Sequence, residues 1–463
     1  MSPLRSLKVQ TEIPGPRSKA LIAEGTFDMQ SIYRTLVIDD DASSGTYIVD
    51  ADGNVILDMF ANFALGSLGY NHPALLEVAR SDAFVHASVN PTSTPFVTTP
   101  AWFDLLHRIE RFAPPGMGKI YFVDAGGEGV ESALKVAFIR HGENRRVAAG
   151  GPKNPLELPA AEQQAILENG GTDAVVISFS GAFHGRGLGP LSATHSKVIH
   201  KADMPAFPWP VVAFPANRFP LERFAEENQK AEDESVSELE RVIDANRGKV
   251  AAIVVEPIQS EGGDRHASPS FFRRVQALAK KAGAMLVLDE VQTGVAGTGK
   301  MWCHEHFELP EPPDLVAFGK KMQLGGFFSR PEHGITQFGR MYQTRNGDRS
   351  RAMLCAAVLE TIEKERLLDS VKQTGTYFLA RLGELAEKFP ALVSDPRGRG
   401  LLLSFDLPTT AARDDLLKRA MKKGVMATYT GTRSVRLRPH LITKEPQVDE
   451  AVRVIAEVLA EMS

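Results

Sequence analysis

The chain has 463 residues, of which 43% are hydrophobic and 24% charged, and its formal net charge is −4. A chain of this length is too long to fold around one simple hydrophobic core, and its composition is ordinary for a globular protein. The charge balance gives no electrostatic basis for binding nucleic acid or an anionic membrane. The two cysteines exclude a disulfide scaffold, and no apolar run is long enough for a membrane span. The N-terminal basic residues are not followed by an apolar targeting segment, so we expect a cytoplasmic protein.

The chain begins with a segment that is rich in proline and has no clear periodicity. Its first thirty residues predict an irregular arm laid over another surface. The run TYIVDADGNVILDMF (46–60) then predicts a β-hairpin, because two β-rich stretches flank Asp52 and Gly53, which are typical turn residues.

From about residue 100, short apolar runs alternate with amphipathic segments. The runs end in polar residues or glycine and lie at 119–126, 174–181, 250–258, 284–291 and 314–319. Helical patterns occupy 131–142 and 269–283, while 151–172 and 221–247 are polar insertions, the second of them a predicted solvated helix. This alternation predicts a mostly parallel sheet covered by helices, with ligands at the carboxyl ends of the strands.

The C-terminal part follows a different pattern, in which helices alternate with the strand-like runs 397–408 and 434–441. We therefore predict an α/β protein with a large domain and a smaller α+β domain. The expected division is 1–66 for the arm and hairpin, which join the small domain, 67–348 for the large domain, and 349–463 for the rest of the small domain.

Two motifs at predicted strand ends carry the strongest chemical signal. LVLDEVQTG (286–294) ends an apolar run in Asp289, and AFGKKMQLGGFF (317–328) places Lys320 or Lys321 before a glycine pair. A lysine amine can hold pyridoxal phosphate as a Schiff base, while a carboxylate keeps its ring nitrogen protonated. Alternatively, Asp289 caps a helix and both lysines are solvated.

A glycine pair also lies between a predicted strand and helix, in DAGGEGVESALK (124–135). Backbone N–H groups at such a helix start form an anion site, and Gly126 and Gly127 would let a phosphate approach closely. A plain strand-to-helix turn explains the same residues. The chain has no GxGxxG or GxxxxGK[ST] motif, which weakens dinucleotide and nucleoside triphosphate hypotheses.

Three further residues could bind a substrate or only stabilise the fold. In SGAFHGRGLG (180–189), Phe183 could cover a cofactor ring and Arg186 could hold a carboxylate, or they form core and a structural ion pair. Glu256 ends a strand, and SVRLRPH (434–440) supplies Arg436. These two would form either a switchable pair or an ion pair that locks the domains together.

Together the motifs resemble the class III (ω-amino acid) aminotransferases of the pyridoxal phosphate fold type I group. The similarity is strongest to eukaryotic-type 4-aminobutyrate aminotransferases. It runs nearly end to end, through TEIPGPRS (11–18), GYNHPAL (69–75), GAFHGR (181–186), THSKVIHKADMPAFPWP (194–210), VEPIQSEGGDRHAS (255–268), DEVQTG (289–294), GKKMQLGGFF (319–328), RGRG (397–400) and VRLRP (435–439).

This resemblance implies a role for each matching residue. Toward the cofactor it implies Lys321 as the Schiff-base lysine, Asp289 at the pyridine nitrogen, Gln292 near the ring hydroxyl, Gly126 and Gly127 at the phosphate, Phe183 over the ring, and Thr344 reaching the phosphate of the neighbouring subunit of a homodimer. Toward the substrate it implies Arg186 for the ω-substrate carboxylate, Glu256 and Arg436 as the switching pair, and Phe60 and Phe63 as pocket walls.

The expected reaction is ping-pong transfer of the terminal amino group of 4-aminobutyrate to 2-oxoglutarate. Val130 and the phrase FDLPTTAARDDLLKR (405–419) look more like bacterial lysine 6-aminotransferases, so L-lysine or another terminal diamine is the alternative donor. Vertebrate members carry paired cysteines where this chain has Ala125 and Glu128, so no iron–sulfur cluster and no other metal is expected. A non-catalytic scaffold would be expected to lack Lys321 or Asp289, and both are present.

Overall fold

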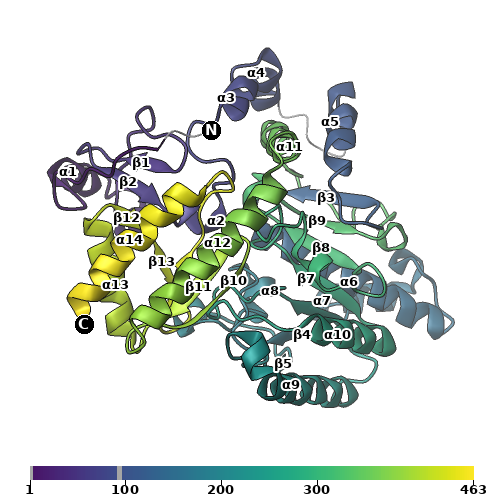
Figure 1. Ribbon diagram of the computed structural model, residues 1–463. Helices are drawn as coiled ribbons and strands as arrows, with labels where there is room; N and C mark the ends of the chain where they lie inside the picture. Colours follow the sequence, from purple (N-terminus) through teal and green to yellow (C-terminus); the bar gives the residue numbers. More distant parts are fainter. Residues whose placement is uncertain (1–3, 91–95) are drawn as a thin grey trace.

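The computed structural model describes residues 4–90 and 96–463 (Figure 1). The first three residues of the predicted arm and residues 91–95 of the predicted large domain therefore lie outside the described part. The large domain is built on a sheet of seven strands in the order β3-β9-β8-β7-β6-β4-β5. Their bounds are β3 (Lys119–Val123), β4 (Val175–Phe179), β5 (Val211–Val212), β6 (Val250–Val255), β7 (Met285–Asp289), β8 (Leu315–Phe318) and β9 (Gly325–Ser329).

The predicted α/β class and the mostly parallel sheet are confirmed. Strands β5, β4, β6, β7 and β8 are parallel neighbours, and only β9 runs antiparallel to both β8 and β3. Strand β9 contains the pair Gly325 and Gly326, and the sequence patterns did not predict this strand because glycine is rare in strands. A Cβ at Gly325 would lie 2.0 Å from the Ala125 carbonyl oxygen, so glycine lets this strand pass directly against the turn before α6.

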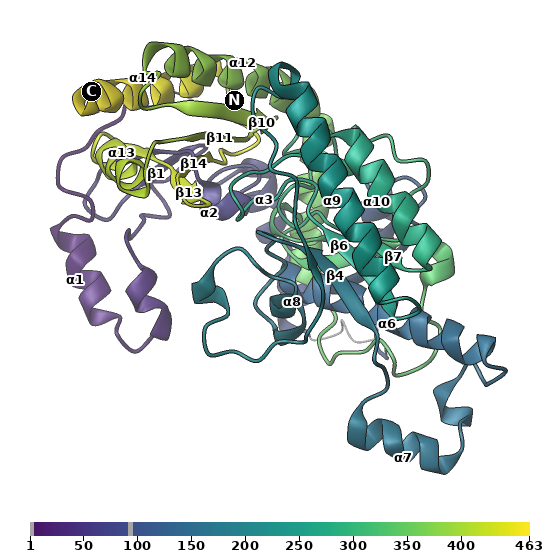
Figure 2. The same cartoon turned by 90° about the horizontal axis from the view of Figure 1, so that it is seen from below.

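Helices cover both faces of this sheet because alternate strand residues point to opposite sides. Ala252 and Val254 of β6 pack in one apolar cluster with α6 (Gly126–Ala148), whereas Ile253 and Val255 join the cluster on the other face. That second face is covered by α10 (Pro269–Ala282), beside which α9 (Ala225–Ala245) runs in Figure 2. The predicted helix in the polar insertion is thus confirmed, but one side of α9 is buried rather than solvated.

The small domain packs a four-stranded antiparallel sheet against three helices. The sheet has the order β10 (Ser394–Arg399), β11 (Leu402–Asp406), β14 (Ser434–Leu437) and β13 (Thr428–Thr430), and the helices are α12 (Leu367–Lys388), α13 (Thr410–Lys422) and α14 (Glu445–Met462). The predicted hairpin is confirmed as β1 (Tyr47–Val49) and β2 (Val55–Asp58), and β12 (Val425–Met426) pairs parallel to β2. Tyr47 and Leu57 of the hairpin share an apolar core with the C-terminal helices.

The predicted irregular arm contains a helix, α1 (Pro16–Glu24), which begins against the hairpin: the backbone N–H groups of Arg17 and Ser18 donate to the carboxylate of Asp52 in the turn between β1 and β2 (Figure 1). Its first residue is proline, which fits the first helical position because no N–H is needed there. The remaining helices are α2 (Ala61–Ala64), α3 (Pro73–Ala79), α4 (Asp82–Val89), α5 (Pro100–Glu110), α7 (Ala160–Asn169), α8 (Leu188–Ser192) and α11 (Arg349–Lys364). None of the helices within residues 4–90 and 96–463 combines the length and apolar character needed to cross a membrane.

Candidate active site

The carboxyl ends of the central strands bring the main candidate residues together. Asp289 is the last residue of β7 and pairs in register with Ala317 of the neighbouring β8. Lys321 follows β8 in a short 3₁₀ turn, and Glu256 follows β6. Segments far apart in the sequence thus meet at one edge of the sheet, as the strand pattern predicted.

Lys321 is buried and lies at the centre of this edge. Its side chain is 3% exposed, and its Nζ donates to the Gln292 carbonyl at 2.8 Å and to the Gly294 carbonyl at 3.2 Å. Burial, with the charge of Arg438, lowers the pKa of Lys321 to about 7. A large fraction of this amine is therefore neutral and nucleophilic at neutral pH. Its neighbour Lys320 instead reaches the Phe63 carbonyl at 2.7 Å, and burial together with Arg436 lowers the pKa of Lys320 to about 7.

Asp289 is held in place by a buried histidine. Its Oδ2 lies 2.8 Å from Nδ1 of His184, and its Oδ1 accepts from the Val291 N–H at 3.0 Å. The backbone N–H of His184 in turn donates to Thr194 Oγ1 at 2.9 Å, which fixes the start of this loop. His184 Nε2 is buried and has no hydrogen-bond partner in the described part of the chain, so the imidazole has capacity for one further polar contact. The sequence placed His184 in this loop but gave it no role.

Gln292 links the large domain to the small domain. Its Oε1 accepts from Nε of Arg438 at 2.9 Å, and Arg438 is fully buried and paired with Asp264. The same guanidinium donates to the Leu403 and Leu437 carbonyls. The backbone oxygen of Gln292 also accepts a hydrogen bond from Nζ of Lys321. Gln292 therefore connects the lysine to the contact between the two domains.

Helix α6 begins at Gly126, and its first backbone N–H groups point out of the helix start. Its cap residue, Ala125, has no side-chain hydrogen bond to the helix. A Cβ at Gly126 would lie 2.5 Å from Cγ1 of Val291, so only glycine lets the helix start this close to β7. Uncapped N–H groups at a helix start favour an anion such as a phosphate.

Phe183, Glu256 and Arg186 lie on the loops after β4 and β6. Glu256 is buried, and its two oxygens accept from the N–H groups of Phe183 at 2.9 Å and Ser260 at 3.1 Å. Burial and the nearby Asp289 raise the pKa of Glu256 well above its ordinary value. Arg186 is exposed, its guanidinium lies 5.9 Å from the centre of the Phe183 ring, and it forms no ion pair within the described residues.

The predicted pairing of Arg436 with Glu256 is wrong, since Arg436 pairs with Glu261. Its Nη1 lies 2.6 Å from Glu261 Oε1, and Lys197 lies 2.9 Å from Oε2. Burial opposes ionisation of Glu261, but Arg436 and Lys197 outweigh it and lower the pKa of Glu261 to about 2. VEPIQSEGG contains both acids, and only the chain path after β6 shows that the second one faces the arginine.

Phe60 and Phe63 form an edge-to-face pair with ring centres 4.4 Å apart. The guanidinium carbon of Arg436 lies 5.0 Å from the centre of the Phe63 ring, so Phe63 does stand beside this candidate site. Thr344 is exposed in the segment before α11, and the adjacent Arg345 lies 3.7 Å from Asp124.

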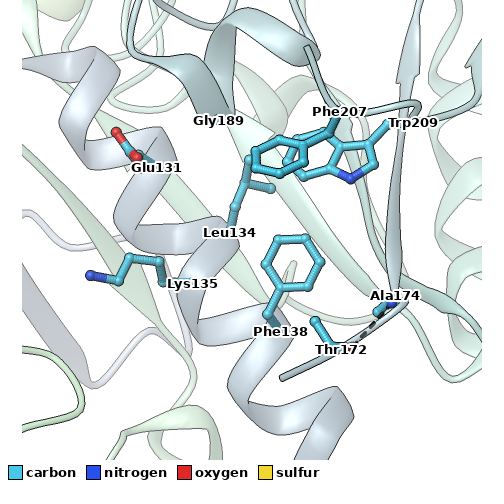
Figure 3. A pocket seen from close by; sticks show the side chains of 9 residues that line it. All are labelled: Glu131, Leu134, Lys135, Phe138, Thr172, Ala174, Gly189, Phe207 and Trp209. Atoms are coloured by element: carbon cyan, nitrogen blue, oxygen red, sulfur yellow. Dashed lines mark hydrogen bonds between the residues drawn. The ribbon is translucent and has the colours of Figure 1, made fainter. Parts of the chain in front are cut away.

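Two hollows lie apart from the lysine. The first, of about 260 Å³, is bounded by α6 on one side and the stacked rings of Phe207 and Trp209 on the other (Figure 3). The second, of about 750 Å³, lies between the domains and is lined by polar and charged residues such as Arg265 and Arg397. Neither contains a residue predicted for the site.

These features match the needs of pyridoxal phosphate. The buried amine of Lys321 can hold the aldehyde, Asp289 can hold a protonated ring nitrogen, and the uncapped start of α6 can hold the phosphate. His184 Nε2, buried without a partner, leaves a polar contact free beside Asp289. The fold and this residue set define the class of pyridoxal phosphate-dependent transferases.

Comparison with known proteins agrees with this class and narrows it. The family described as Aminotransferase class-III matches residues 29–459. The chain is 38% identical over 456 residues to a 4-aminobutyrate aminotransferase of Dictyostelium discoideum, with coverage of 98% of this chain and 91% of the relative. It is 37% identical over 457 residues to the mitochondrial 4-aminobutyrate aminotransferase of Homo sapiens, with the same coverage.

Among solved structures, a lysine aminotransferase from M. tuberculosis superimposes with a TM-score of 0.87 at 32% identity. The match covers 96% of this chain and all of that one. The chain therefore belongs to the class III aminotransferases, which depend on pyridoxal phosphate. The predicted family, fold type I architecture, cofactor and enzyme class are confirmed.

Proposed function

We propose that this enzyme moves the terminal amino group of 4-aminobutyrate to 2-oxoglutarate, giving succinate semialdehyde and glutamate. The names of its relatives support the donor. One structural observation carries the proposal, namely that the two candidate carboxylate arginines are in opposite states. Arg186 is exposed and has no ion pair within the described residues, whereas Arg436 is buried and neutralised by Glu261.

This arrangement suits a donor that has only one carboxylate. The carboxylate of an ω-amino acid would pair with Arg186, which directs its distant amino group toward Lys321. Because Glu261 occupies Arg436, no second anion is needed there. The acceptor 2-oxoglutarate has two carboxylates, so it would bind Arg186 with one and Arg436 with the other after Glu261 withdraws.

Several residues would act directly on the cofactor and the reacting atoms. Asp289, oriented by His184, would keep the ring nitrogen protonated, and Gln292 would contact the ring hydroxyl. When bound, pyridoxal phosphate supplies an electron sink for the electron pair left by the broken substrate C–H bond. The Lys321 amine, with its pKa lowered to about 7, would take that proton and return it at the next position.

We further propose that the enzyme is a homodimer, in which Thr344 of one subunit reaches the phosphate of the other. Exposed apolar side chains support an interface, including Val198, Ile199, Phe338 and Tyr342. The proposed location is the cytoplasm, for which the two free, buried thiols, Cys303 and Cys355, are suitable.

The alternative donor is L-lysine, which is favoured by the likeness to the lysine aminotransferase structure. Product analysis separates the two functions. The enzyme is incubated with 2-oxoglutarate and either donor, and glutamate and the ω-aldehyde are quantified. The proposal predicts efficient formation of succinate semialdehyde from 4-aminobutyrate, and efficient turnover of L-lysine with poor turnover of 4-aminobutyrate would reject it.

A further inference from the structure

The turn that carries Phe63 has an unusual backbone. Ala61, Asn62, Phe63 and Ala64 have φ values of 45°, 48°, 59° and 65°, which form one left-handed turn without a glycine. Residues with side chains rarely adopt this conformation, even singly. A run of four persists only where the surrounding structure holds it, and such strain concentrates at functional sites.

The start of the turn is held by a buried carboxylate. Asp58 is fully buried and accepts from the N–H groups of Phe60 and Ala61, both at 2.8 Å. The Tyr70 hydroxyl donates to its other oxygen at 2.8 Å, and His440 Nε2 lies 3.3 Å away. The orientation of the first residues is therefore fixed from both the hairpin and the segment after β14.

The other end of the turn is held by Lys320, the neighbour of the cofactor lysine. Its Nζ donates to the carbonyl of Phe63 at 2.7 Å, across 257 positions of sequence. Lys320 therefore connects the turn to the segment that carries Lys321.

The turn presents the Phe63 ring to Arg436. The guanidinium carbon lies 5.0 Å from the ring centre, within cation–π distance. Arg436 is 1% exposed and its Nη1 binds Glu261, but among residues 4–90 and 96–463 its buried Nε has no hydrogen-bond partner. One donor of this arginine is thus available for a ligand, and the Phe63 ring packs against the same guanidinium.

We propose that Lys320 is a positioning residue for the acceptor half-reaction, which holds Phe63 against Arg436 so that this guanidinium is oriented for a dicarboxylate. The inference rests on the proposed function, because it assumes that 2-oxoglutarate binds at Arg436. An oriented guanidinium loses less freedom when a carboxylate binds. The ω-amino donor does not use Arg436, so its binding does not depend on Lys320.

The test is a double-mutant cycle on holoenzyme, read out by binding of glutarate, an unreactive dicarboxylate. Lys320→Met removes the amine but keeps the chain length, and Phe63→Leu removes the ring. Exposed Lys119 on β3 supplies the matched control, Lys119→Met. Calorimetry gives each dissociation constant, and steady-state kinetics gives KM for 2-oxoglutarate and for 4-aminobutyrate.

We expect Lys320→Met to weaken glutarate binding about fivefold, a size typical of one lost cation–π contact. KM for 2-oxoglutarate should rise in parallel, KM for 4-aminobutyrate should not change, and Lys320→Arg should restore most of the affinity. In the Phe63→Leu background, Lys320→Met should have little further effect. An equal loss in both backgrounds would mean that Lys320 acts by charge alone, and no loss in either background would likewise overturn the proposal. Wild-type enzyme that fails to bind glutarate would instead reject the proposed acceptor, and the inference with it.

Discussion

The Glu261→Gln variant tests the pairing that separates the two half-reactions. Glutamine keeps the shape of the side chain but removes its charge, so Arg436 loses its neutralising partner. The acceptor would then no longer compete with a carboxylate for this arginine. We expect tighter binding of dicarboxylates and a slower reaction with 4-aminobutyrate, whose carboxylate would be drawn to Arg436 in an unproductive orientation.

The structure gives the size of this effect. Arg436 and Lys197 together lower the pKa of Glu261 from 4.5 to about 2 against the cost of burial. That lowering corresponds to about 3.5 kcal/mol, since one pKa unit equals about 1.4 kcal/mol. Burial offsets part of this interaction and Lys197 shares it, so we expect a change in affinity on the order of tenfold when Arg436 loses this carboxylate.

Calorimetric titration of holoenzyme with glutarate measures this change directly. The matched control is Glu256→Gln, which alters a second buried acid that does not contact Arg436. We expect about tenfold tighter binding for Glu261→Gln and an unchanged dissociation constant for the control. Unchanged or weaker binding in Glu261→Gln would contradict a competition between Glu261 and the ligand for Arg436, as would an equal gain in Glu256→Gln.

Other variants test the remaining roles. Lys321→Ala should lower kcat at least about a thousandfold in a coupled glutamate assay, because proton transfer and cofactor attachment are lost together, and normal turnover would reject the assignment. Pyridoxal phosphate can be added to cofactor-free protein, trapped on Lys321 with borohydride and quantified by peptide mass spectrometry. The trapped fraction should rise with pH and reach half of its maximum near pH 7, where the amine loses its proton. A midpoint near that of an ordinary lysine would contradict the lowered pKa. Asp289→Asn should reduce kcat about a hundredfold, because a fixed charge near the reacting atoms is removed, and rapid-mixing spectroscopy would show whether the chemical step is the one slowed. Arg186→Ala should raise KM for 4-aminobutyrate more than KM for glutamate, which has a second carboxylate for Arg436, and equal increases would argue against its role.

Much of the fold could be predicted because its signals are local. Five apolar runs became β3, β4, β6, β7 and β8, since buried parallel strands read as continuous apolar sequence. Strand β9 was missed because a pair of glycines is not typical of a strand. Gly325 is needed because the carbonyl of Ala125, which is distant in the sequence, lies where a side chain would be. Helix α1 was missed because prolines around it obscured a helix that begins with one of them.

Some residues of the candidate site could be predicted from the sequence and others could not. Asp289 ends β7 and Lys321 follows β8, so their convergence could be predicted from chain order alone. The choice of Glu261 over Glu256 as the partner of Arg436 could not be predicted, because five residues of irregular backbone decide which carboxylate faces the arginine. The support of Asp289 by His184 joins residues 105 positions apart, and no periodicity in the sequence reports such a contact.

The most direct test of the proposed function is one half-reaction followed by absorbance. The purified pyridoxal phosphate form is mixed in a stopped-flow instrument with 4-aminobutyrate, L-lysine, L-ornithine or β-alanine, and conversion to the pyridoxamine form is recorded. We expect rapid conversion by 4-aminobutyrate and slow conversion by the other three. Rapid conversion by L-lysine, with 4-aminobutyrate slow, would contradict the proposed donor.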